Sequence, residues 1–135
     1  MERVMMTLLP FVVSRVLSLL FLSLAFCAAP AAVCAPKNVY PVEGCSKESV
    51  LLVVSAFQQA KSPIAFDLYV ICTEKAWQDF LKAHRFPASV VALTDWKAGR
   101  IFVGPHPIND EANLHRTAVH ELKHLTCHCN LGENL

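Results

Sequence analysis

The residues best suited to chemistry in this chain lie near its C-terminal end, in the pattern H-E-x-x-H. His120 and His124 are four positions apart, and Glu121 lies between them. On an α-helix this spacing puts both histidines on one face, about 6 Å apart along the axis. Two such imidazoles can bind one Zn²⁺ ion, which in catalytic sites keeps a position open for water. Glu121 could take a proton from that water, so the pattern predicts metal-assisted hydrolysis, most often of a peptide bond.

The residues around the motif favour a helix that could present it. Asn109 is a candidate N-cap, and Asp110 and Glu111 would place negative charge in the first turn. The alternative is a charged surface helix in which the two histidines are incidental. In both cases a helix over this segment is favoured by an apolar stripe at helical spacing, formed by Leu114, Ala118, Leu122 and Leu125.

The motif and its surroundings resemble the zincin metallopeptidases. Thr117, three residues before His120, fits the extended pattern of that family, whereas Lys123 and Thr126 depart from it. Cys127 stands where the metzincin pattern requires glycine, so that subfamily is excluded and no other is assigned. The resemblance is carried by about the last 40 residues. It implies a small zincin-like domain with Zn²⁺ as cofactor, the two histidines as ligands, the glutamate as catalytic base, and a peptide or protein substrate.

A catalytic zinc ion commonly has three protein ligands, and the motif supplies two. His128 and Glu133 are the candidates for the third. On a continuous helix His128 lies about 12 Å along the axis from His120, so it could bind the same ion only if the helix breaks near Leu125. Glu133 follows residues that suit a helix C-cap, which would turn the chain back toward the site. The sequence leaves the third ligand open.

The start of the chain predicts an export signal over residues 1–31. Arg3 and Arg15 precede an apolar run over residues 16–29, and small residues after it offer a cleavage site before Ala32. The run is short for a transmembrane helix, which needs about 20 apolar residues. An uncleaved signal that anchors the protein in the membrane is the alternative. We therefore expect a secreted or periplasmic protein in which residues 32–135 form one domain.

Length and charge further restrict the classes of function and partner that fit this chain. A mature chain of about 100 residues is long enough for one modest core. The formal net charge is +1 and no basic run is present, which argues against nucleic acid and acidic surfaces as partners. Besides a peptidase, two functions remain open: a non-catalytic zinc-binding module, and a disulfide-stapled interaction module with an incidental H-E-x-x-H. The oligomeric state is not predicted.

The cysteines favour an oxidising compartment. The expected mature chain contains an odd number of them, so one thiol would be free or would pair with another chain. Positions 127 and 129 point to different sides of a helix, so these two cysteines are not expected to bridge each other. One of them should instead link the active helix to Cys45 or Cys72, and thiolate ligation of zinc is the less favoured alternative. The five cysteines are Cys34, Cys45, Cys72, Cys127 and Cys129.

We expect an α+β fold in the order helix, strand, helix, β-hairpin and active helix. Ser46 and Thr73 are predicted to cap the first two helices, residues 36–45 to be extended, and residues 104–107 to form a rigid connector. The resemblance to zincins implies that a strand of the hairpin lies at the sheet edge and pairs with the substrate backbone, here residues 100–104. The expected bounds are 47–61 and 74–84 for the helices, 64–72 for the first strand, and 89–94 and 100–104 for the hairpin strands.

Overall fold

A computed structural model of the chain describes residues 36–42 and 44–129. The predicted signal peptide, Cys34 and the candidate ligand Glu133 lie outside these ranges. Within them, no helix combines the length and the apolar character needed to cross a membrane.

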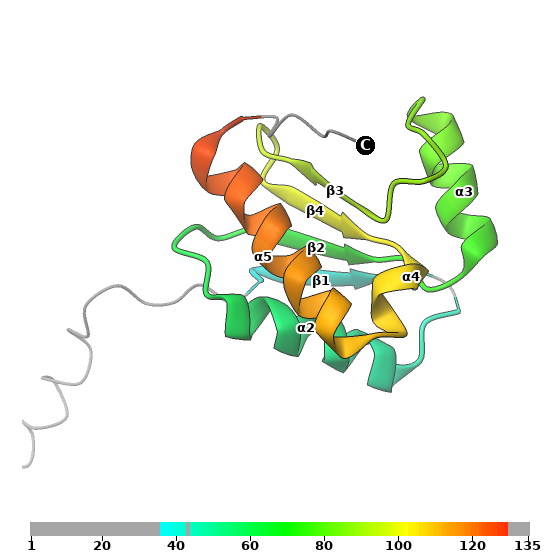
Figure 1. The fold of residues 1–135 in the computed structure, drawn as a ribbon, viewed down its shortest axis with the longest axis horizontal. Helices are drawn as coiled ribbons and strands as arrows, with labels where there is room; N and C mark the ends of the chain where they lie inside the picture. The colour runs from blue at the N-terminus through cyan, green and yellow to red at the C-terminus, as the bar shows by residue number, and fades with distance from the viewer. Residues whose placement is uncertain (1–35, 43, 130–135) are drawn as a thin grey trace, which may run out of the picture. The chain divides into compact units, whose positions relative to one another are not determined.

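The described residues form an α+β fold built on a small four-stranded sheet, so the predicted class is confirmed. The sheet order is β1-β2-β4-β3; the first three of these run parallel, and β3 is antiparallel to β4 (Figure 1). In chain order the elements are β1 (Asn38–Pro41), α2 (Lys47–Ala60), β2 (Asp67–Val70), α3 (Glu74–Ala83), β3 (Ala92–Asp95), β4 (Arg100–Val103), α4 (Pro105–Ile108) and α5 (Glu111–Cys127).

Side-chain caps explain where the three long helices begin. The Ser46 hydroxyl accepts from the Ser49 amide at 3.0 Å at the start of α2. Thr73 caps α3 in the same way, so both predicted caps are confirmed. Asn109 was the wrong candidate for α5, because it ends α4 instead. The cap of α5 is Asp110, whose carboxylate accepts from the first-turn amides.

Two elements are absent from the predicted order. Residues 38–41, expected only to be extended, form β1, which pairs in parallel with β2. Residues 105–108, expected to be a rigid connector, form the one-turn helix α4, with Gly104 as N-cap and Pro105 at the first helical position.

The expectation that residues 100–104 form the edge strand was also wrong. β4 lies inside the sheet, and β3 lies at its edge.

One face of the sheet is covered by α2 and α5, which lie side by side across it (Figure 1). Alternate residues of the two central strands are buried against these helices. All four residues of the predicted apolar stripe of α5 are buried there, which places the opposite side of this helix toward solvent. The strand residues are Leu68, Val70, Ile101 and Val103, and α2 adds Val53, Ala56 and Phe57.

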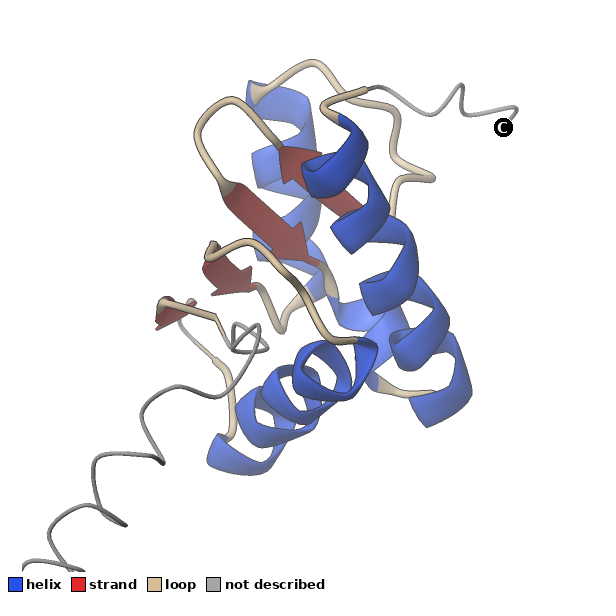
Figure 2. Ribbon diagram, turned by 90° about the vertical axis from the view of Figure 1, so that its left-hand side faces the viewer, coloured by secondary structure: helices blue, strands red, loops and turns tan. Residues whose placement is uncertain are grey.

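The other face of the sheet packs against α3 (Figure 2). Trp77 is fully buried there and donates its indole N–H to the Val90 carbonyl at 2.8 Å. Gly104 lies against this indole, and a Cβ at that position would come within 2.6 Å of it. Residue 104 must therefore be glycine for α3 to pack in this way. The hydrogen bond from Trp77 to Val90 holds the chain just before β3 begins.

Candidate metal centre

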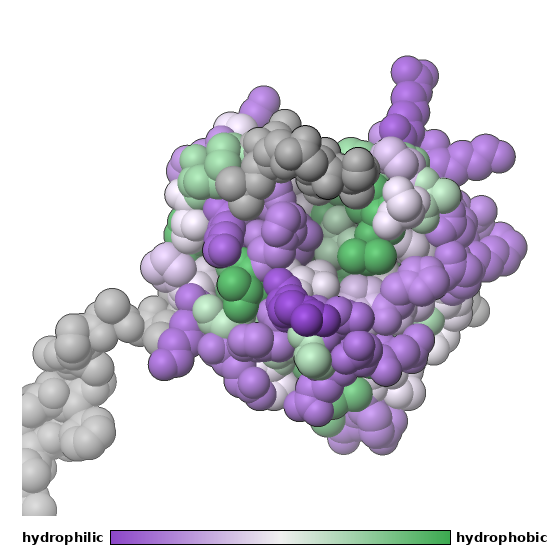
Figure 3. All heavy atoms as spheres, viewed as in Figure 1, coloured by the Kyte–Doolittle hydropathy of each residue, from purple (hydrophilic) through white to green (hydrophobic). Residues whose placement is uncertain are grey.

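The three motif residues lie on the C-terminal half of α5, next to the edge strand β3. Figure 3 shows the surface hollowed between this part of α5 and the segment that leads into β3, with apolar residues on its wall. His120 is exposed, whereas Glu121 is only 4% exposed and His124 only 7%. The packed stripe of α5 therefore holds two of the three polar side chains below the surface.

The two imidazoles converge on one point. The Nε2 atoms of His120 and His124 are 3.1 Å apart, and the rings meet edge to face. Two nitrogens bound to one tetrahedral zinc ion at 2.0–2.1 Å would be about 3.3 Å apart. The observed separation therefore fits a pair of ligands to one ion. It also fits an N–H···N hydrogen bond between two neutral rings.

A main-chain carbonyl sets the orientation of His124. Its Nδ1 lies 2.9 Å from the carbonyl oxygen of Cys129. Because a carbonyl oxygen only accepts, Nδ1 carries the proton and Nε2 carries the lone pair in the neutral ring. This is the arrangement that metal-binding histidines usually show, with one nitrogen toward the ion and the other donating to a fixed acceptor.

The carboxylate of Glu121 is held from the edge strand. The hydroxyl of Thr94 in β3 lies 2.6 Å from Oε2 of Glu121 and 3.1 Å from its main-chain oxygen. This short hydrogen bond limits the rotation of the buried carboxylate. One ligand atom each from His120, Glu121 and His124 lie within 4.8 Å of one another, so this group could hold a metal ion.

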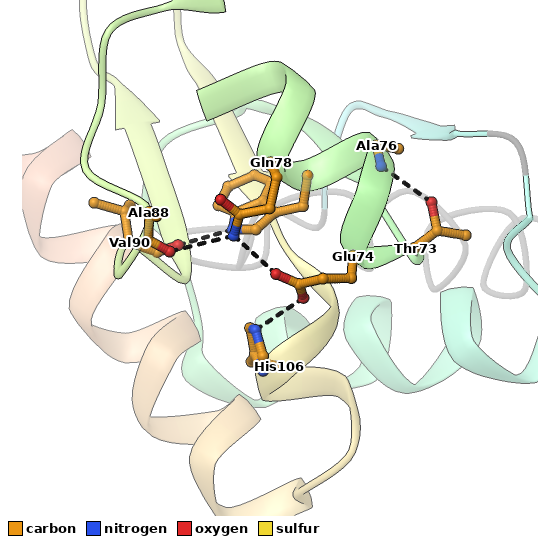
Figure 4. A network of polar contacts seen from close by, with 8 residues as sticks. Thr73, Glu74, Ala76, Gln78, Ala88, Val90 and His106 are labelled. Carbon is orange, nitrogen blue, oxygen red and sulfur yellow. Dashed lines mark hydrogen bonds and ion pairs between the residues drawn. The ribbon is translucent and has the colours of Figure 1, made fainter. Parts of the chain in front are cut away.

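Two further histidines, His128 and His106, lie away from this group. His128 follows the end of α5, and its ring stacks on Trp96 with centroids 5.4 Å apart. The helix runs unbroken past Leu125, so the condition for His128 to bind the same ion is not met. Nε2 of His106 lies 2.9 Å from a carboxylate oxygen of Glu74, at the start of α3 (Figure 4). The other candidate, Glu133, lies outside the described residues.

The cysteine pairing differs from the prediction in one respect. Cys45 bonds to Cys72, while Cys127 and Cys129 bond to each other. The prediction that this last pair would not bridge assumed a helix continuing through residue 129. Instead α5 ends at Cys127, and His128 adopts a left-handed conformation with φ 52° and ψ 36°. This turn brings the second cysteine back to the first, so no disulfide links α5 to Cys45 or Cys72.

Sequence reasoning missed two groups that contact the motif. Thr94 belongs to an expected strand, but its contact with Glu121 depends on how that strand packs beside α5. The Cys129 carbonyl is a main-chain group, so its contact with His124 cannot be predicted from the type of residue at position 129. The sequence signals of a turn near this point were the closely spaced cysteines and the C-cap residues before Glu133.

Comparisons of the chain with protein-family models, curated proteins and solved structures gave no match. The function is therefore argued from the geometry of the site.

Proposed function

We propose that this protein is an exported zinc-dependent hydrolase, most simply a peptidase. In this proposal His120 and His124 bind the ion and Glu121 acts as the general base. The observation that carries it is the 3.1 Å separation of the two Nε2 atoms, with a buried carboxylate in the same group.

The donor set favours zinc. Imidazole nitrogen is a ligand that zinc accepts readily, and His124 already has its second nitrogen on a fixed acceptor. A bound zinc ion would supply a Lewis acid that lowers the pKa of a coordinated water to about 7. Glu121 would accept the proton, and Thr94 would keep its carboxylate in place. For the third protein ligand, Glu133 stays the prediction, because His128 stacks on Trp96 beyond an unbroken α5.

The sheet edge beside the site supports an extended peptide as substrate. In the described part of the chain β3 pairs only with β4, on its inner side. Val91 accepts from Gly104 at 2.9 Å, so the main-chain groups of Ala92 and Thr94 point away from β4. A substrate backbone could add to this edge and lie next to Glu121, since Thr94 belongs to the edge strand and its hydroxyl contacts Glu121.

Export is supported by the two disulfides, which form and persist in oxidising compartments. The same disulfides favour a second candidate, a stapled interaction module in which the two imidazoles share a hydrogen bond. Metal binding separates the two. The module predicts no stoichiometric zinc, and the hydrolase predicts one tightly bound ion per chain.

The decisive experiment combines metal analysis with proteolysis. Purified full-length protein would be tested for zinc content and for cleavage of an unfolded protein substrate, with and without chelator. We expect one zinc per chain, and cleavage that is lost on chelation and restored by zinc. Glu121→Gln should keep the zinc and lose cleavage, whereas Glu111→Gln, an exposed change on the same helix, should alter neither. Zinc-loaded protein that cleaves nothing in wild-type form would leave a non-catalytic zinc module and overturn the peptidase.

A further inference from the structure

The turn after α5 is closed by a covalent bond between residues two positions apart. Cys127 is the last residue of the helix, His128 takes the left-handed conformation, and Cys129 returns to bond with Cys127. The Cα atoms of the two cysteines are 5.1 Å apart. A left-handed conformation is unfavourable for a residue with a side chain, so the turn needs support from its surroundings.

Three contacts provide that support. The disulfide holds the turn at the helix end, and the His128 ring stacks on Trp96 of the β3–β4 connection. The amide of His128 also donates to the His124 carbonyl at 3.1 Å, which closes the last turn of the helix. Of these contacts, only the disulfide acts directly on Cys129.

The position of Cys129 matters because its carbonyl oxygen accepts from Nδ1 of His124 at 2.9 Å. That contact sets the tautomer and the ring orientation of a proposed zinc ligand. Loss of such an outer partner commonly weakens metal binding 10–100-fold.

We propose that the Cys127–Cys129 disulfide is a positioning element of the metal centre, so that its reduction weakens metal binding. The inference rests on the proposed function in one respect: His120 and His124 must hold the ion. A dithiol would reduce the bond, giving two protein thiols and a cyclic disulfide. Cys129 would then be tethered only through the main chain, and its carbonyl could leave His124.

The matched control is the second disulfide, Cys45–Cys72, in which Cys45 precedes α2 and Cys72 follows β2. Zinc dissociation constants would be measured by competition with a chromogenic chelator, in non-reducing buffer, on full-length chains. We expect Cys127→Ala/Cys129→Ala to bind zinc 10–100-fold more weakly than wild type. Cys45→Ala/Cys72→Ala should bind within a fewfold of wild type, and circular dichroism would check that each variant folds.

A further variant tests the stacked ring without touching the covalent bond. His128→Gly keeps the disulfide, suits the left-handed conformation and removes the stack on Trp96. We expect it to bind zinc nearly as tightly as wild type. If it loses as much affinity as the double cysteine variant, the stack positions Cys129 and the inference about the disulfide is wrong.

The outcomes separate the two proposals. Wild-type protein that binds no zinc overturns the proposed function, and this inference with it. Zinc binding that is equally tight in wild type and in Cys127→Ala/Cys129→Ala overturns the inference alone.

The freed thiols could instead become ligands, and cobalt distinguishes this case. Co²⁺-loaded Cys45→Ala/Cys72→Ala protein would be titrated with a phosphine reductant. Because this variant lacks the Cys45–Cys72 disulfide, the bond under test is Cys127–Cys129. We expect weaker cobalt binding and no sulfur-to-cobalt charge-transfer band. Tighter binding with such a band would mean that the cysteines act as ligands, and would overturn the positioning role.

Discussion

The three motif side chains differ in their surroundings, and these differences predict different effects of mutation. Each histidine would supply one of the two ligands that the motif offers, whereas Glu121 is held by Thr94 and lies beside the converging nitrogens. His120→Ala or His124→Ala should therefore lose zinc, and the melting temperature should fall if the ion also stabilises α5. Glu121→Gln should keep zinc and a wild-type melting temperature, while turnover falls 10²–10⁴-fold.

These variants would be compared by metal analysis, thermal melting and peptide turnover. His115→Ala is the control for the histidine changes, because His115 is an exposed histidine on the same helix. If Glu121→Gln loses zinc as readily as the histidine variants, Glu121 is a ligand or a structural partner, and the proposed mechanism loses its base.

Thr94 should matter through Glu121 alone. Thr94→Val keeps the shape of the side chain and removes the hydroxyl that lies 2.6 Å from the buried carboxylate. A hydrogen bond to a charged group contributes about 1.5–3 kcal/mol, so the free energy of unfolding should fall by that order. Zinc binding should be retained, and kcat should fall more than KM changes, because the base is less well oriented. Thr126→Val is the control, since this exposed hydroxyl contacts only main-chain oxygens of α5. Equal effects of the two variants would exclude a special role for Thr94.

At the scale of single elements, the sequence predicted what depends on neighbouring residues. The caps Ser46 and Thr73 and the apolar stripe of α5 are local patterns, and the structure confirms them. Leu51 of α2 is apolar yet 58% exposed, because the helix buries Val53, Ala56 and Phe57 instead. A helix with five consecutive apolar residues, as α2 has at 50–54, does not indicate which of its sides will meet the sheet.

The missed elements and contacts depend on partners that are distant in the sequence. β1 has four mostly exposed residues, and it is a strand because its backbone pairs with β2. The contact between Thr94 and Glu121 requires β3 at the sheet edge, which the hairpin alone does not determine. The motif helix was therefore predictable from the sequence, while the groups that orient its side chains were not.

The cap of α5 gives a test at this scale. Asp110 accepts from the amides of Ala112 and Asn113 at 3.1 and 3.2 Å, and also from the Asn113 side chain. Asp110→Ala should lower the free energy of unfolding by about 0.5–2 kcal/mol, measured by urea denaturation. Asn109→Ala, at the position first expected to be the cap, should have a smaller effect. The opposite ranking would mean that α5 begins one residue earlier in solution.

The edge strand predicts how a substrate should respond to changes in its backbone. Main-chain pairing with β3 would use every second substrate amide, because alternate N–H groups point to opposite sides of a strand. Once a cleaved peptide is known, N-methylation of one amide at a time should raise KM in an alternating pattern. Methylation that has the same effect at each position would contradict binding by strand addition.

At the scale of the whole molecule, the two disulfides should have separable roles. Cys45–Cys72 links residues 27 apart in sequence, whereas Cys127–Cys129 links residues two apart. In the chain-entropy account, the longer loop corresponds to about 3–4 kcal/mol of stabilisation and the shorter loop to about 1–2 kcal/mol. Cys45→Ala/Cys72→Ala should therefore lower the urea midpoint more than Cys127→Ala/Cys129→Ala does.

Zinc affinity should follow the reverse order, because only the second pair adjoins the carbonyl that orients His124. Urea unfolding of the metal-free proteins and zinc competition on the folded proteins would measure the two quantities independently. A crossed result, with one disulfide dominating stability and the other dominating affinity, is expected from this arrangement. If the variant with the larger loss of stability also shows the larger loss of affinity, zinc binding follows global folding, and the short disulfide has no local role at the metal centre.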